Sequence, residues 1–177
     1  SGASAIITVN TTVSGSATGT ISNTASVVST ETDTNTANNS ATQTTALVVP
    51  GSISGFAYLD VNRNGVRDAG DTPLSGVAVA LSGTETASGL VVNRPTTTDS
   101  TGAYTFSNLL PGTYQIVQTQ PADLKDGQSN VGTGATAPGT AGTNQITSIV
   151  LGSGDVGAAF NFGELPLDFS KRLFLSR

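Results

Sequence analysis

Residues 52–71 read SISGFAYLDVNRNGVRDAGD and join a strand-forming run to a loop rich in Asp, Asn and Gly. The first nine residues, with their isoleucine and aromatic side chains, are typical of a β-strand. The last twelve, residues 60–71, place five acids and asparagines around a central glycine. The stretch therefore predicts a strand that leads into either an ordinary polar turn or a loop that holds a cation.

The spacing within this loop meets every requirement of an EF-hand-type calcium loop, in which positions 1, 3, 5, 7, 9 and 12 supply oxygen and position 6 is glycine. Gly65 holds position 6, and the six ligand positions are held by Asp60, Asn62, Asn64, Val66 (through its backbone carbonyl), Asp68 and Asp71. A helical EF-hand has a bidentate Glu at the last position, so the shorter Asp71 would bind through one oxygen or through water. The alternative is an Asx-rich turn, which uses the same residue types for backbone geometry alone.

Composition restricts the chemistry of the whole chain. The 177 residues include no Cys, His, Met or Trp, only 11% are charged, and the formal net charge is −5. Zinc-finger, thiol, Ser-His-Asp and haem chemistry are excluded, so a bound metal must be a hard cation held by oxygen. No Lys or Arg precedes Arg63, and no basic stripe exists, which argues against a nucleic-acid partner.

Residues 1–48 alternate in strand fashion at 5–13, 20–28 and 41–49 but contain no aromatic residue. Three strands of such small side chains bury too little apolar area to offset the entropy of ordering them. We therefore expect half a domain, paired along an edge with absent residues or with another copy of the chain. Pro50 and Gly51 end the last strand, which predicts a linker at 49–51.

All nine aromatic residues follow Ser52, and this part of the chain has a fuller strand rhythm. Turn signals at 99–102, 111–112 and 152–154 have the spacing of a β-sandwich. Strand patterns cover residues 52–60, 73–83, 90–100, 102–121, 143–154 and 157–164. We expect an all-β domain over 52–164 that folds independently of residues 1–48.

Several motifs in order resemble the B-type domains of the serine-aspartate-repeat adhesins, which are related to the B-type domains of the collagen adhesin. They are GFAYLDVNRNGVRDAGD at 55–71, PLSGVAVAL at 73–81, TTTDSTGAYTFSNLLPGTY at 96–114 and NFGE at 161–164. The resemblance covers residues 51–164. It implies a transthyretin/prealbumin-like β-sandwich of about seven strands in a modular extracellular stalk on a bacterial cell surface, with Ca²⁺ in the loop 60–71.

Residues 2–45 resemble the C-terminal half of conserved-repeat, immunoglobulin-like modules of large bacterial surface proteins. The strand NTASV, the acid-rich turn and the strand NNSAT are the matching elements, and the upstream strands of such a module are missing. This resemblance implies a partial immunoglobulin-like β-sandwich ahead of the calcium-binding domain.

The B-type family is also known for intramolecular isopeptide bonds between Lys and Asn, promoted by a buried acid. Such a bond needs a lysine on a strand that faces the core. The only lysines are Lys125, in a loop containing Gly and Asp, and Lys171, in the tail. We therefore expect no isopeptide bond, and calcium as the stabiliser in its place.

The remaining acids lie in predicted turns rather than on facing strands, so the sequence does not predict an enzyme. Asp99 is explained by a hairpin turn, with metal binding as the less favoured alternative. We interpret four more acids as solvated or turn residues, with orientation of the last strand as a second role for the last of them: Asp123, Asp126, Asp155 and Glu164.

The tail, residues 165–177, lacks a sortase pattern and is either a frayed terminus or a recognition and anchoring segment. No run is long enough to form a transmembrane segment, and the first ten residues lack a signal-peptide pattern, so the chain is either a mature segment or a piece of a longer protein. The leading hypothesis is a calcium-stabilised structural segment of a bacterial surface or extracellular protein, which could form filaments. The alternative is an adhesin module that binds an extracellular protein or glycan, which an exposed aromatic platform or apolar groove would favour, whereas aromatics wholly in the core would favour the structural segment.

Overall fold

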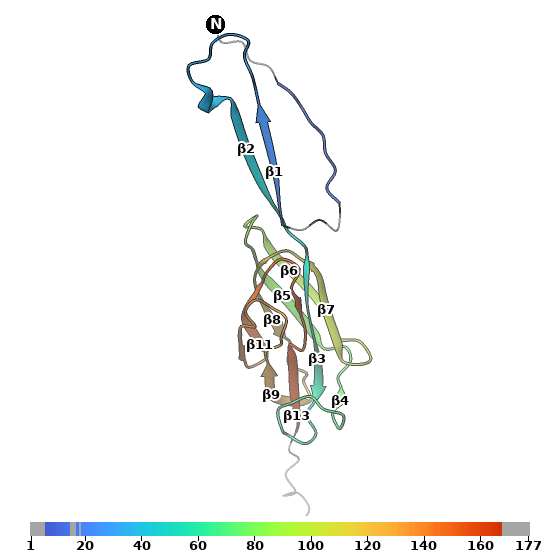
Figure 1. Cartoon of the computed structure of the whole chain (residues 1–177). Coiled ribbons are helices and arrows are strands. Elements are labelled where there is room, and N and C mark those ends of the chain that lie inside the picture. Colours follow the sequence, from blue (N-terminus) through green and yellow to red (C-terminus); the bar gives the residue numbers. More distant parts are fainter. Residues whose placement is uncertain (1–5, 15–16, 18, 168–177) are drawn as a thin grey trace, which may run out of the picture. The chain divides into compact units, whose positions relative to one another are not determined.

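The computed structural model describes residues 6–14, 17 and 19–167, and all of its long elements are β-strands (Figure 1). The chain divides into two compact units, unit 1 at Ser1–Val48 and unit 2 at Val49–Arg177. No helix in the described part of the chain is long and apolar enough to cross a membrane. The predicted all-β fold is confirmed.

Unit 1 contains one antiparallel hairpin made of β1 (Gly19–Ser26) and β2 (Ser40–Leu47), with the short 3-10 turn η1 (Thr36–Asn38) between them. Side chains alternate between the two faces of a strand. One face of the hairpin carries mainly Ser and Thr, and Thr24 and Thr42 form a hydrogen bond of 2.8 Å there. The other face, the groove face, carries Gly19, Ile21, Asn23 and Ala25 of β1 and Ala41, Gln43, Thr45 and Leu47 of β2.

The strand predicted at 5–13 is absent from the structure over its described residues. Residues 6–14 have no regular secondary structure, and Ala5 lies outside the described residues. The side chains of Ile7 and Val9 are 87% and 74% exposed. Alternating sequence alone does not make a strand, because the backbone also needs a hydrogen-bonded neighbour.

Unit 2 is a β-sandwich, as predicted. Its first sheet has the strand order β10-β11-β8-β5-β6, with bounds Thr140–Gly142, Gln145–Leu151, Gly112–Gln118, Ala78–Glu85 and Val91–Thr97. Its second sheet is organised around β3 (Gly51–Leu59). This strand pairs antiparallel with β7 (Ala103–Leu109) and β4 (Thr72–Pro73), and parallel with β12 (Val156–Gly157) and β13 (Asn161–Pro166).

The core lies between these two sheets. It is formed by every second residue of the strands, as the alternation in the sequence predicts. Residues of β8 alternate strictly between buried and exposed, so that Tyr114 and Ile116 face inward. They meet Tyr104, Phe106 and Phe162 from the second sheet. The Tyr104 hydroxyl donates to the Phe160 carbonyl over 2.6 Å, which satisfies a buried polar group.

Two local predictions differ from the structure. The segment around Lys125, expected to be a loop, forms β9 (Leu124–Asn130), which pairs antiparallel with β13. Lys125 itself is exposed rather than core-facing. The turn at Asp99, expected to close a hairpin, instead connects β6 in the first sheet with β7 in the second.

Candidate functional site

The loop 60–71 begins with a buried carboxylate. Asp60 follows the last residue of β3 and is only 2% exposed. Its Oδ1 accepts the backbone N–H of Asn64 over 3.1 Å, and its Oδ2 accepts that of Gly65 over 2.7 Å. Its own N–H donates to the Glu164 carbonyl over 2.8 Å. Asp60 therefore fixes the first turn of the loop and connects it to β13.

Three polar side chains meet in the middle of the loop. The amides of Asn62 and Asn64 both donate to Oδ2 of Asp68, over 2.8 and 2.9 Å. The side-chain oxygens of the two asparagines accept the N–H groups of Asn64 and Val66, over 3.0 and 2.8 Å. These contacts are Asx turns, which is the geometry that the alternative interpretation of the loop requires.

Asp71, at the last position of the pattern, forms hydrogen bonds with residues near both ends of the loop. Asp71 accepts the N–H of Val61 over 3.1 Å and the N–H of Asp68 over 2.9 Å. Hydrogen bonds from the Gly70 N–H and then from the Asn62 and Asn64 amides hold the pKa of Asp68 below its ordinary value. The carboxylate of Asp68 is therefore anionic at neutral pH.

Both the backbone conformation and the neighbouring side chains require glycine at the centre of the loop. Gly65 has a φ of +77°, and a Cβ placed on it would lie 2.2 Å from Oε1 of Gln128 on β9. Its carbonyl accepts the Asn130 side-chain amide over 2.8 Å. The loop is thus held by β3, β13 and β9 together, which are adjacent strands of one sheet.

The donor set suits Ca²⁺, which binds carboxylate, amide and carbonyl oxygens. Asn62, Asn64 and Asp68 converge on one point, and a half-turn of each amide would direct its oxygen there. Asp60 and Asp71 are bonded instead to backbone N–H groups. The side chain of Val66 has no ligand atom, so only its backbone carbonyl could serve. Among the described residues, no three acidic side chains form a metal-binding cluster.

The loop carries both acidic and basic side chains, three aspartates and two arginines. Burial, followed by the charges of Asp60 and Asp71, raises the pKa of Tyr58 to about 12. The guanidinium carbon of Arg67 lies 3.8 Å from the centre of the Phe56 ring, so this cation packs on an aromatic face. The three carboxylates of the loop carry like charges, and a bound divalent cation would offset their repulsion.

The acids outside the loop are turn or core residues. Asp99 accepts the N–H groups of Thr101 and Ala103 over 2.7 and 3.0 Å, and the Thr101 hydroxyl together with these N–H groups lowers its pKa. Asp155 accepts from Gly152 and Thr136 and likewise has a lowered pKa. Asp123 and Asp126 are exposed.

Glu164 is different from the solvated residue that we expected. It is completely buried, and its two oxygens accept the side-chain amides of Gln118 and Gln120, the latter over 2.7 Å. Burial raises its pKa, and the two amide bonds oppose that shift. The sequence did contain a signal: Gln118 continues the inward-facing set of Tyr114 and Ile116 on β8, so a polar residue at this position needs a buried partner.

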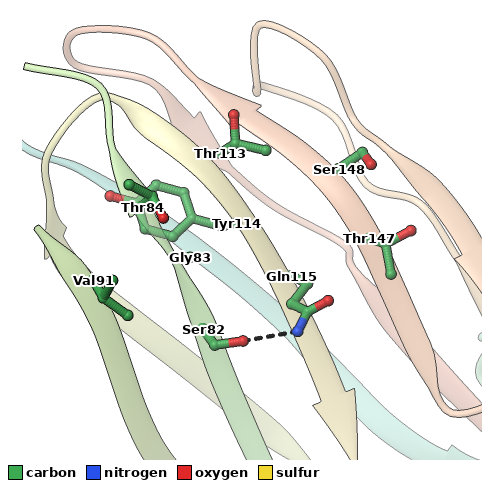
Figure 2. A pocket seen from close by; sticks show the side chains of 9 residues that line it. All are labelled: Ser82, Gly83, Thr84, Val91, Thr113, Tyr114, Gln115, Thr147 and Ser148. Atoms are coloured by element: carbon green, nitrogen blue, oxygen red, sulfur yellow. Dashed lines mark hydrogen bonds between the residues drawn. The ribbon is translucent and has the colours of Figure 1, made fainter. Parts of the chain in front are cut away.

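A shallow hollow lies on the outer face of the first sheet (Figure 2). It is lined by uncharged residues of β5, β6, β8 and β11, including Ser82, Thr113, Gln115 and Thr147, and the Gln115 amide donates to the Ser82 hydroxyl over 2.9 Å. The nearby Tyr114 ring is only 1% exposed. The hollow therefore presents hydroxyl groups without an aromatic surface for stacking.

Comparison with known families gives a match to the SdrD B-like domain over residues 51–163, more than half of the 177-residue chain. The chain belongs to the SdrD B-like domain family. The match covers unit 2 from the first residue of β3 to within three residues of the end of β13. The resemblance expected from the sequence motifs is confirmed.

The chain is also similar to parts of curated proteins. Colossin-A of Dictyostelium discoideum is 44% identical over 75 residues, which is 42% of this chain and 1% of that protein. Serine-aspartate repeat-containing protein C of Staphylococcus aureus is 34% identical over 82 residues, 46% of this chain and 8% of that protein. Among solved structures, the minor pilin of Streptococcus agalactiae aligns with a TM-score of 0.43 and 15% identity, over 75% of this chain and 50% of that one. The chain spans only a small part of the length of these curated relatives.

Proposed function

We propose that this chain is a non-enzymatic structural segment of a large bacterial cell-surface or extracellular protein, in which Ca²⁺ bound in the loop 60–71 stabilises the SdrD B-like domain. The observation that carries the proposal is the position of the loop. Its oxygen ligands follow the end of β3, and it is bonded to β13 through Asp60 and to β9 through Gly65. An ion held there would connect three strands of one sheet.

The ligands of the proposed ion are Asp60, Asn62, Asn64, Val66 through its carbonyl, Asp68 and Asp71. When bound, the ion supplies positive charge among carboxylates that otherwise repel one another. The residues of the chain orient the ligands: Gly65 permits the sharp turn, and the N–H groups that Asp60 and Asp71 accept hold both ends of the loop in place.

The alternative function, an adhesin module for a protein or glycan, has less support. The buried aromatic residues of the described chain are Tyr58, Tyr104, Phe106, Tyr114, Phe160 and Phe162. The remaining described aromatic, Phe56, lies under Arg67. Because exposed aromatic surfaces mark many ligand-binding modules, aromatic residues of unit 2 that lie in the core or under a cation favour the structural role for that unit. The uncharged lining of the surface hollow likewise gives no support to catalysis.

Thermal unfolding tests the calcium proposal. Extracellular calcium modules have dissociation constants of about 10⁻⁴ to 10⁻³ M. At about 10 mM Ca²⁺, binding in this range adds about 1.4–2.7 kcal/mol to the free energy of unfolding. The Tm of unit 2 should therefore rise by several degrees over its value in chelator.

Two variants locate the effect. Asp68→Asn removes a ligand charge from an exposed side chain, and we expect it to reduce the calcium-dependent rise in Tm by at least half. Asp99→Asn removes the same charge from an Asx turn outside the loop and should leave the rise unchanged. An equal rise in all three proteins would place the ion elsewhere, and no rise in the unmodified chain would reject the proposal.

A further inference from the structure

The loop that follows β3 contains a chemically reactive pair of residues (Figure 1). Asn64 is followed by Gly65, and no other asparagine in the sequence precedes a glycine. In such a pair the backbone nitrogen of the glycine can attack the side-chain amide carbon of the asparagine, because glycine has no side chain to obstruct the approach. Asparagine is accordingly among the thermally labile residues of proteins. The sequence therefore places one site of spontaneous deamidation within the loop 60–71.

The side-chain amide of Asn64 is held in a way that favours attack on its carbonyl carbon. Its Oδ1 accepts the Val66 N–H over 2.8 Å, and its Nδ2 donates to Oδ2 of Asp68 over 2.9 Å. An N–H group aimed at this oxygen stabilises the negative charge that develops there when a nucleophile adds to the carbon. Asn64 is exposed, so water has access to the reaction product. The electrophile of the pair is therefore ready to react.

The nucleophile of the pair is restrained by the same loop. The Gly65 N–H donates to Oδ2 of Asp60 over 2.7 Å, and Asp60 is only 2% exposed. Gly65 is itself buried, with Gln128 against its Cα and the Asn130 amide bonded to its carbonyl. A nitrogen that donates to a carboxylate keeps its proton, because losing the proton would place two negative charges side by side. The contact with Asp60 therefore opposes the attack while the loop is closed.

We propose that Asn64 and Gly65 form a deamidation site that Asp60 keeps closed, and that opening of the first turn of the loop releases it. In the reaction the Gly65 nitrogen loses its proton to water and forms a bond to Cγ of Asn64. The bond between Cγ and Nδ2 breaks, and Nδ2 leaves as ammonia. Water then opens the resulting succinimide ring at one of its two carbonyl carbons, which gives aspartate or isoaspartate at position 64. The only co-reactant is water.

Either product changes the loop permanently. Aspartate adds a carboxylate to the three that the loop already contains. Isoaspartate lengthens the backbone by one methylene group immediately before Gly65. The longer backbone displaces Gly65 from its fit against Gln128 and from its bond to Asn130, which are the contacts of the loop with β9. Deamidation thus turns a temporary opening of the loop into a lasting loss of its attachment to the sheet.

Mass spectrometry of the full chain, incubated in chelator at neutral pH, tests the site. Each deamidation adds about 1 Da, the difference between an amide and a carboxylic acid, and peptide mapping assigns it to a residue. We expect Asn64 to react before any other asparagine, and about 10-fold more slowly in the folded chain than in concentrated urea, because a hydrogen bond to a charged group contributes at least this factor. Reaction first at another asparagine, or equal rates in the two states, would overturn the proposal.

Three variants separate the role of Asp60 from a general loosening of the loop. Asp60→Asn keeps an oxygen acceptor for the Gly65 N–H but removes its charge, and should react at Asn64 about 10-fold faster than the unmodified chain. Asp71→Asn weakens contacts of the loop that do not involve Gly65 and should accelerate the reaction much less. Asp99→Asn, outside the loop, should leave the rate unchanged.

Equal rates in Asp60→Asn and Asp71→Asn would refute the restraining role of Asp60. The comparison of folded and urea-unfolded chain needs no variant, so it decides the proposal even where a substitution prevents folding. Because every incubation contains chelator, failure of this inference leaves the proposed calcium role standing, and failure of that role leaves the deamidation site standing.

Discussion

Gly65 shows how one residue serves both the loop and the sandwich. Its positive φ gives the loop its sharp turn, and its missing side chain allows Gln128 of β9 to approach. Any other residue would meet both the left-handed strain and a contact of 2.2 Å with the Gln128 side chain. The glycine that the calcium-loop pattern requires is thus also required by the packing against β9.

We predict that Gly65→Ala lowers the free energy of unfolding by about 2–3 kcal/mol, because left-handed strain adds to the clash. Gly76→Ala is the matched control, since Gly76 has a φ of +76° and no atom within 4 Å of the added Cβ. It should cost about 1 kcal/mol. Chemical denaturation measures both values. Equal losses would show that Gln128 does not restrict this position.

Glu164 gives a prediction about pH. Its pKa is raised in the folded state, so the stability that its protonated form contributes is complete below the unfolded pKa and is lost as the pH rises through the folded pKa. Asp68, Asp99 and Asp155 have lowered pKa values and act in the opposite direction, at lower pH. Comparison with Glu164→Gln removes their contribution, because both proteins contain them.

The stability of the unmodified chain relative to Glu164→Gln should therefore fall as the pH is raised from about 4 to 7. Urea unfolding at several pH values gives this difference directly. A difference that does not change with pH, or one that grows as the pH rises, contradicts the assigned direction of the shift.

At the scale of elements, the alternation of apolar and polar residues predicted a strand well where the sequence also indicated the strand that pairs with it. β3 and β8 carry isoleucine and aromatic side chains at inward positions and were located from the sequence to within a few residues. β9, with the sequence LKDGQSN, has few residues of high β propensity and is a strand because it pairs with β13. Residues 6–14 are the reverse case, since they alternate but have no paired strand among the described residues.

The candidate site was predicted only in part for the same reason. Spacing along the chain identified the loop 60–71, which is local. The Glu164 cluster joins residues more than forty positions apart, so it depends on which strands become neighbours. The two-residue alternation of β8 indicated that Gln118 faces inward, but it could not show which residue Gln118 contacts.

The exposed position of Lys125 on β9 leads to a prediction about covalent structure. An isopeptide bond needs a lysine directed into the core, and Lys171 lies outside the described residues. We expect intact-mass spectrometry to give the mass of the unmodified chain. A deficit of about 17 Da, the mass of ammonia that each such bond releases, would contradict this expectation.

At the scale of the whole molecule, the two units differ in how much they bury. Unit 2 has a continuous core of aromatic and branched side chains, whereas every described residue of β1 is exposed. Amide hydrogens exchange slowly where opening requires the core to unfold, and quickly in marginal hairpins.

We therefore predict that, in dilute monomeric chain, amides of β1 and β2 exchange at least 100-fold faster than those of β3 and β8. Raising the protein concentration should slow exchange in β1 and β2 if further strands pair with the hairpin. Hydrogen exchange followed by mass spectrometry makes the comparison. Strong protection of the hairpin in a monomer would show that unit 1 is stable by itself.

The loop 60–71 and the end of β13 lie at the same end of unit 2, because the Asp60 N–H donates to the Glu164 carbonyl just before β13 ends. An ion in the loop would therefore fix the end of the domain from which the chain continues. In the proposed role, calcium would therefore stabilise this end of unit 2.

Titration calorimetry of calcium into the unmodified chain and into Asp71→Asn tests this central claim most directly. The account predicts a binding heat with a dissociation constant of 10⁻³ M or tighter for the unmodified chain, in the range of about 10⁻⁴ to 10⁻³ M for extracellular modules. It predicts binding at least 10-fold weaker in Asp71→Asn, because this acid supplies the last ligand position and bonds both ends of the loop. The absence of binding heat from the unmodified chain, or equal affinity in both proteins, would contradict it.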